Sequence, residues 1–163
     1  MDIKVEITHL QELEAALSKC PGAIKRNLKL AMLVSLRNIQ RRARQEHNFR
    51  SRSGNLERSI KPEIISEWPL KGRVFLNQTL TKTDDGGSYG VYVHEGTPPH
   101  IIVPKDKRCL RWAGGDGFVF SKRVNHPGTK KDPFLYNAGE NERDEINNVF
   151  ERYTLRALKE VGV

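Results

Sequence analysis

The longest periodic segment of the chain is AIKRNLKLAMLVSLRNIQRRARQEH, residues 23–47, which contains no proline and no glycine. Its apolar residues recur every three or four positions, which is typical of an amphipathic helix with one buried face. At 1.5 Å per residue this helix is about 37 Å long. A second helical pattern begins at Asp132, which we expect to cap the helix ahead of Pro133, and ends near Val161.

Shorter segments alternate apolar and polar residues, as strands with one buried face do. The predicted strands cover residues 3–7, 61–68, 71–78, 91–95, 100–104, 109–112 and 117–124. A short helix is expected before Pro21 and Gly22. Two stretches, 79–88 and 113–117, are rich in polar residues or glycine and are expected to be flexible loops.

The order of these elements predicts the fold class α+β. We expect one domain, residues 1–163, with a central antiparallel β-sheet packed by a long N-terminal helix and a C-terminal helix. Four apolar residues of the last strand pair are expected to close part of the core. They are Leu110, Trp112, Phe118 and Phe120.

Composition limits where the protein acts. The mean hydropathy is −0.62, and no apolar run is long enough to span a bilayer. The first ten residues lack the apolar segment of a signal peptide, so we expect the chain to stay in a cytoplasm or in an assembly built there. Cys20 and Cys109 are far apart and are expected to be reduced thiols.

Positive charge is unevenly distributed. The net charge is +8, with nine Lys and Arg against one acid over residues 23–52 and eight against two over residues 104–131. Two basic clusters are therefore candidates for DNA-facing or subunit-bridging contacts. The first is Arg37, Arg41, Arg42, Arg44, Arg50 and Arg52, and the second is Lys105, Lys107, Arg108 and Arg111.

Three interpretations of these clusters stay open. Arginines can bind phosphate oxygens of DNA, or they can be a solvated helix end. They can also meet an acidic surface of a neighbouring copy in a head-to-tail ring. The acidic residues that would form that surface are Glu140, Glu142, Asp144 and Glu145.

The sequence offers little for catalysis or metal binding. His94, His100, Cys109 and His126 have no regular ligand spacing, and we expect the histidines to hold turns. The acidic residues are scattered rather than paired as a metal-dependent nuclease requires. The glycine-rich AGGDG lacks the Lys-Ser or Lys-Thr of a phosphate-binding loop. We therefore predict no enzyme, no cofactor and no metal.

Four fragments in order resemble one protein family. They are SGNLERSI (53–60), YGVYVHEGT (89–97), HIIVPKDKRCLRW (100–112) and HPGTKKDPFLYNA (126–138). Together they resemble the tail-component proteins of tailed bacteriophages, which are tail-completion or neck proteins. The residues that carry the motifs are Gly54, Leu56, Gly96, Thr97, Pro104, His126, Pro127, Gly128, Pro133 and Phe134.

The resemblance implies a non-enzymatic virion protein made in the cytoplasm of a bacterial host. It implies a ring of copies, six in the family expectation, around the channel through which DNA leaves the head. The expected partners are the head–tail connector, the tail terminator or tail tube, and packaged double-stranded DNA through phosphate contacts, with no membrane. The alternative is a free DNA-binding protein or a metal-dependent nuclease.

Overall fold

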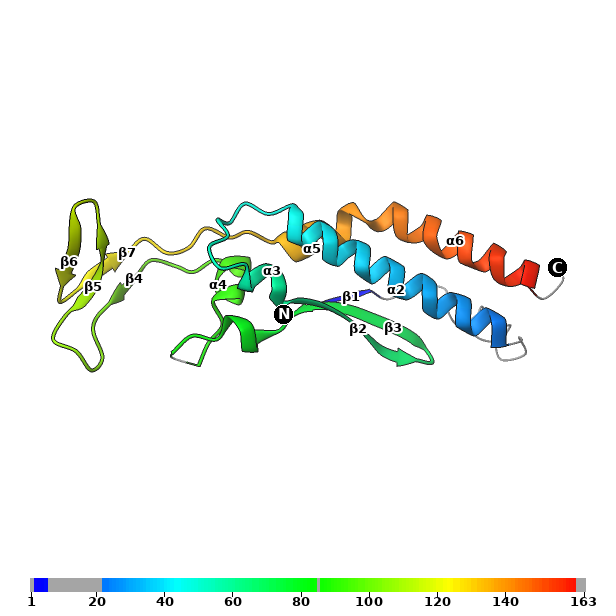
Figure 1. Cartoon of the computed structure of the whole chain (residues 1–163), viewed down its shortest axis with the longest axis horizontal. Coiled ribbons are helices and arrows are strands. Elements are labelled where there is room, and N and C mark those ends of the chain that lie inside the picture. The colour runs from blue at the N-terminus through cyan, green and yellow to red at the C-terminus, as the bar shows by residue number, and fades with distance from the viewer. Residues whose placement is uncertain (1, 6–21, 85, 161–163) are drawn as a thin grey trace.

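The computed structural model describes residues 2–5, 22–84 and 86–160. It confirms the α+β class, since helices pack against antiparallel strands. Figure 1 shows an elongated molecule, with a body of helices and one sheet and a thin arm that projects from it. The short helix predicted before Pro21 lies outside the described residues.

Helix α2, Gly22–Gln45, confirms the predicted long helix and forms the centre of the body. One continuous face is buried, as the apolar period requires. The buried residues of this face are Ile24, Asn27, Leu28, Ala31, Met32, Ser35, Leu36, Ile39 and Ala43. This face contacts both a sheet and the C-terminal helices, so α2 joins the two layers.

The sheet under α2 has three antiparallel strands in the order β1-β3-β2, namely Asp2–Val5, Leu70–Leu76 and Ile60–Glu67. Along β3 every second residue is buried, so one side of the strand faces α2. Gly72 lies on that side. A Cβ added to Gly72 would stand 2.7 Å from Leu36 Cδ1 and 2.9 Å from Met32 Sδ. The absence of a side chain there lets the helix lie close to the sheet.

The predicted C-terminal helix is divided in two, which corrects the single helix from Asp132 to Val161. Helix α5 covers Phe134–Asn141 and α6 covers Arg143–Glu160, and α6 runs beside α2 in the opposite direction (Figure 1). The break lies at Glu142, whose side chain turns inward and accepts a 2.6 Å hydrogen bond from Arg42 Nε.

Asp132 does not cap α5, which is a second correction. The residue before the helix is Pro133, and the Asp132 carboxylate reaches back to the end of α2. Asp132 does lie next to a helix, as the sequence predicts. Its carboxylate, however, accepts hydrogen bonds from the backbone of Asn48 and Phe49 and not from that helix.

Residues 91–95 form no strand, which corrects another prediction. They belong to helix α4, Tyr89–Glu95. Tyr89 and Val93 pack against the core cluster, and Gly90 and His94 are buried. Both pairs have the four-residue spacing of one helical face. Five alternating residues fit either structure, and contacts across the fold decide between them.

The predicted loop 79–88 contains ordered contacts. It begins in the 3-10 helix η1, Gln78–Thr81, whose cap Asn77 accepts a hydrogen bond from Thr79 N. Thr81 and Ser88 are buried and share a 2.6 Å hydroxyl–hydroxyl hydrogen bond that closes the loop. Helix α3, Asn55–Ser59, packs against η1.

The arm carries two small antiparallel pairs (Figure 1). Strands β4, His100–Ile102, and β7, Val124–His126, form its stem. Strands β5, Leu110–Gly114, and β6, Gly117–Ser121, form a hairpin at its end, as predicted. The predicted loop 113–117 is mostly strand, since only Gly115 and Asp116 lie between β5 and β6.

The apolar residues of this hairpin do not join the core, which corrects their prediction. Phe118 is 59% exposed, Phe120 61% and Trp112 42%, while Leu110 is partly buried. The antiparallel strands form three separate sheets. Helix α2 packs against the sheet of β1, β3 and β2.

Replacing Gly72 with alanine tests the close contact between α2 and β3. Leu36 and Met32 are both fully buried, so they have little room to move away from the new methyl group. We expect Gly72→Ala to lower the free energy of unfolding by about 1–3 kcal/mol. Gly115→Ala is the matched control, because nothing lies within 4 Å of its added Cβ. Equal urea midpoints for the two variants would contradict the packing described.

Candidate functional site

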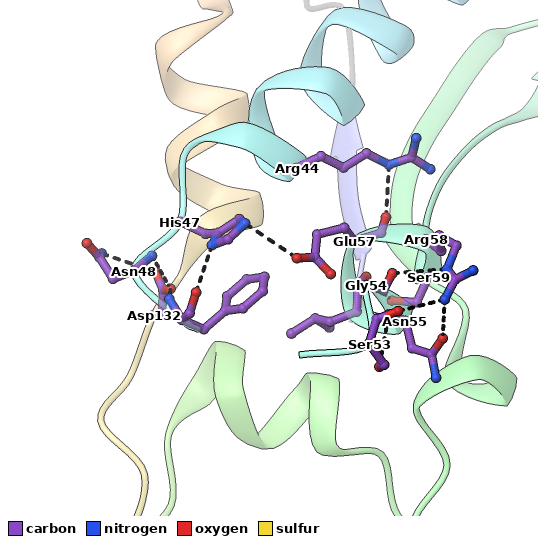
Figure 2. Close-up of polar contacts among 12 residues, drawn as sticks. Arg44, His47, Asn48, Ser53, Gly54, Asn55, Glu57, Arg58, Ser59 and Asp132 are labelled. Atoms are coloured by element: carbon purple, nitrogen blue, oxygen red, sulfur yellow. Dashed lines mark hydrogen bonds and ion pairs between the residues drawn. The ribbon is translucent and has the colours of Figure 1, made fainter. Parts of the chain in front are cut away.

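A joint lies where α2 ends and the arm begins, and it brings together three distant segments (Figure 2). Asp132 Oδ2 accepts hydrogen bonds from Asn48 N at 2.7 Å and from Phe49 N at 3.0 Å. Its own backbone N–H donates to Val93 O. Asp132 is buried, so its carboxylate fixes the chain after α2 against the segment that leads from the arm into α5.

An aromatic stack fills the centre of this joint. The rings of His47 and Phe49 stack with centroids 3.7 Å apart, and the Phe49 ring meets the ring of buried Phe134 edge-on at 5.2 Å. His47 Nδ1 lies 3.1 Å from Phe49 O, and Nε2 lies 3.8 Å from Glu57 Oε1. Both ring nitrogens thus face groups of the same chain, and the imidazole has a structural role.

Arginine side chains hold the segment that follows. Arg58 donates to Ser53 O at 2.7 Å and to Gly54 O at 3.2 Å, closing the turn around Gly54, whose φ is +69°. Arg44 donates to Glu57 O at 2.9 Å and to Ile60 O at 3.0 Å. The SGNLERSI fragment is therefore a folded connection between α2 and β2, built by cation–carbonyl hydrogen bonds.

A cavity of about 360 Å³ opens beside this connection. Its mouth carries the exposed Arg50 and Arg52, and Glu57 contributes a carboxylate to the wall. The remaining lining residues are Phe49, Ser51, Ser53, Gly54, Asn55, Leu56, Tyr89 and Val93. The positive charges of Arg50 and Arg52 favour an anionic ligand.

Two glycines allow the two segments of the arm to meet where the arm leaves the body, at Thr97 and Thr129, which we call the root of the arm. Thr97 and Thr129 exchange backbone hydrogen bonds of 3.0 and 3.2 Å across it. Gly96 has φ +76°, and a Cβ there would lie 2.8 Å from Thr129 O. Gly128 has φ +90°, and a Cβ there would collide with Thr97 O. A residue with a side chain at either position would push apart the two segments of the arm that meet here.

His94 lies on α4, two residues before Gly96. It is fully buried, and its ring meets the Phe134 and Tyr136 rings edge-on at 5.0 and 4.9 Å. Its Nδ1 lies 3.1 Å from Glu95 Oε1, while Nε2 is buried with no hydrogen-bond partner among the described residues. Burial lowers the pKa of His94, although the nearby Glu95 carboxylate acts against that shift.

The other two histidines hold turns, as predicted. His100 Nδ1 lies 2.9 Å from Pro98 O, and His126 Nδ1 accepts a 3.1 Å hydrogen bond from Gly128 N. The turn-holding role was wrong for His94, which packs in the core. Among the described residues no group of three or more His, Cys, Asp and Glu side chains converges on a possible metal position.

The first basic cluster divides into internal and external members. Arg42 donates to Glu142 at 2.6 Å and to Glu46 at 2.8 Å, and these two carboxylates raise the pKa of its guanidinium. Arg44 is bound to backbone carbonyls. The members that are exposed and make no polar contact with the described residues are Arg37, Arg41, Arg50 and Arg52.

The second cluster lies entirely on the arm. Lys105, Lys107 and Arg108 are exposed in the connection between β4 and β5 and pair with no acid among the described residues. Arg111 on β5 lies over the Phe118 ring, with Cζ 4.1 Å from the centroid. These cations therefore face outward, apart from the contact of Arg111 with its own hairpin.

The predicted acidic surface is largely neutralised within the chain. Glu142 is 2% exposed and pairs with Arg42. Glu140 pairs with Arg143, and Glu145 with Arg152. Asp144 alone of the four is exposed without an ion-pair partner among the described residues.

The motif residues of the resemblance lie at joints of the fold. Gly54 directly precedes α3, and Leu56 and Phe134 are buried. The others border the arm or the start of α5, and they are Gly96, Thr97, Pro104, His126, Pro127, Gly128 and Pro133. Asp132 and Glu142 had no sequence signal for their observed roles, because their partners lie 84 and 100 residues away.

Comparisons with protein-family models, with curated proteins and with solved structures found no match to this chain. None of its described helices has the length and apolar character needed to cross a membrane.

Removing the Asp132 carboxylate tests the joint. Asp132→Ala leaves two partly buried backbone N–H groups without their carboxylate acceptor, so we expect a loss of about 2–3 kcal/mol in the free energy of unfolding. Asp106→Ala removes an exposed carboxylate with no ion-pair partner among the described residues and should change stability by less than about 0.5 kcal/mol. If Asp132→Ala lost no more stability than the control, the Asp132 carboxylate would not hold the joint together.

The buried His94 predicts how stability depends on pH. Its pKa is lowered on folding, so below the unfolded value of about 6.5 the unfolded chain binds more protons than the folded chain. The stability is fully present above that value and is lost as the pH falls. We expect urea midpoints between about pH 8 and about pH 5.5 to fall less for His94→Leu than for the wild type. The exposed His100→Asn variant is the control, and it should keep the wild-type slope.

Proposed function

We propose that this chain is a structural subunit of a tailed-bacteriophage neck. In this proposal it completes the tail, joins the head connector to the tail, and forms part of a ring around the DNA channel. Two things support it: the four ordered fragments that resemble tail-component proteins, and the apolar hairpin that the fold leaves exposed at the end of its arm.

The exposed hairpin carries the proposal. An isolated two-stranded hairpin is marginally stable in water, and contiguous exposed apolar side chains mark surfaces that other molecules cover. Phe118 and Phe120 are more than half exposed. A projecting arm with such an end suits a subunit that contacts its neighbours in an assembly.

The external arginines suit the lining or the subunit contacts of such a ring. Arg37, Arg41, Arg50 and Arg52 are exposed and form no ion pair with an acid among the described residues. Facing DNA, they would bind phosphates without reading sequence, and the binding would weaken steeply with salt. Facing a neighbour, they would bridge to its carboxylates.

A free DNA-binding protein remains the second candidate, favoured by the net charge of +8 and these same arginines. It predicts that the purified chain alone binds duplex DNA with a steep salt dependence. A nuclease would in addition require carboxylates gathered around a metal ion.

Deleting the gene from the phage that encodes it tests the neck proposal. Electron microscopy of the lysate should show DNA-filled heads separate from free tails, or tails of faulty length, because the joining step is lost. Supplying the intact gene from a plasmid is the control and should restore joined particles. Normal infectious particles from the deletion strain would refute the proposal.

A further inference from the structure

The hairpin of the arm carries large apolar side chains on both of its faces. In the register, Trp112 lies opposite Val119, and Ala113 lies opposite Phe118. Residues directly opposite in an antiparallel pair share a face, and successive residues alternate. One face therefore carries Trp112 and Val119. The other carries Phe118 and Phe120 together with Arg111, which lies opposite Phe120 and over the Phe118 ring. A hairpin that packed on a flat surface would need only one apolar face.

Both faces are open in the isolated chain. The exposed fractions on one face are 42% for Trp112 and 41% for Val119, and on the other 59% for Phe118 and 61% for Phe120. Each strand has five residues and is about 17 Å long. An occupant that covers both faces must offer two walls, each about 10 Å from the plane of the strands.

Five cations flank the hairpin in the sequence, and one acid, Asp106, lies between two of them. We call the five cations the basic collar, and its members are Lys105, Lys107, Arg108, Lys122 and Arg123. All five are exposed, and none pairs with an acid among the described residues. They precede β5 or follow β6, at the end of the hairpin opposite its turn. A groove that receives the hairpin would meet the collar with its rim.

The distribution of charge within the hairpin argues against nucleic acid as the occupant. Proteins that bind single strands combine a positively charged groove along the phosphate backbone with aromatic side chains on which successive bases stack. Here the turn holds Asp116, and Arg111 is already stacked on Phe118. Val119 is aliphatic and offers no ring for a base to stack on. The mixed aromatic and aliphatic faces suit a protein groove.

Charge also argues against a second copy of this chain. Most acids of α5 and α6 already pair with arginines of the chain, as Glu140 does with Arg143 and Glu145 with Arg152. Two cavities of the body have cationic walls. One carries Arg50 and Arg52, and the other is lined by Arg152, Leu155, Arg156, Lys159 and Glu160. A basic collar would be repelled from either of them.

We propose that the hairpin, residues 110–121, inserts into an apolar groove of a different protein, and that carboxylates on the rim of that groove pair with the basic collar. This inference rests on the proposed function, which makes another neck protein the bearer of the groove. The aromatic side chains supply affinity, while the collar sets orientation and excludes surfaces without acids.

Site-specific photo-cross-linking tests the docking. p-Benzoylphenylalanine replaces Phe118 in the full chain, expressed from its own locus, and irradiation is followed by mass spectrometry of the linked peptides. The expected product joins position 118 to apolar residues of one different protein, with Asp or Glu close by in its sequence or structure. The same photoreactive residue at Leu155, exposed on α6, is the control and should not give that product.

Three results would overturn the inference: linkage to a second copy, linkage to nucleic acid, or no linkage at position 118. The two experiments can fail independently. If the deletion separates heads from tails but position 118 links to a second copy, the neck proposal stands and the groove proposal fails. If particles are normal but the expected linkage forms, the neck proposal fails and the docking into a groove stands.

Charge reversal tests the acidic rim separately. Lys105→Glu with Lys107→Glu should reduce the yield of the cross-link at least about tenfold, because like charges then face each other across the rim. Lys61→Glu with Lys82→Glu changes the net charge equally at exposed positions of the body and should leave the yield unchanged. Thermal melting checks that both double variants fold. An undiminished yield from the collar variant would exclude an acidic rim.

Discussion

The contact of α2 with two layers at once is the constraint on which the body depends. Its buried face must cover the three-stranded sheet and also receive α5 and α6. Gly72 permits the close approach on one side, where Met32 and Leu36 fill the space above β3. On the other side Arg42 is paired with the buried Glu142, at the break between α5 and α6. A buried charge needs its partner, so this pair fixes where the last helix bends.

The sequence predicted elements whose signals are local and failed where distant contacts decide. The period of residues 23–47 identifies α2 because it extends over many turns. Residues 91–95 are too few to separate a strand from a helix, and the buried pair of Gly90 and His94 makes α4 a helix. The oxygens of Asp132 bind amides 83 and 84 residues away, which no nearby pattern reveals. Phe118 and Phe120 were predicted to be buried because they are apolar, but they are exposed in the isolated chain. Apolar character alone does not tell whether a residue packs in its own core or against another molecule.

The joint and the arm connect this fold to the proposed role. Asp132, the two root glycines and the Thr97–Thr129 hydrogen bonds hold the arm to the body, so that the hairpin has a defined place. The charges follow the same division. Arginines that build the fold, such as Arg44, are bound inside, whereas the basic collar and Arg41 face outward. A fold that leaves apolar and cationic surfaces open is suited to assembly.

The most direct measurement of the central claim is a cryo-electron microscopy map of intact particles of the phage that the proposed function assigns to this chain. The account predicts density for this α+β body in a ring between head and tail, with each arm extended and both faces of its hairpin covered by another protein. Purified particles that lack the chain, or rings in which the hairpins stand uncovered in solvent, would contradict it.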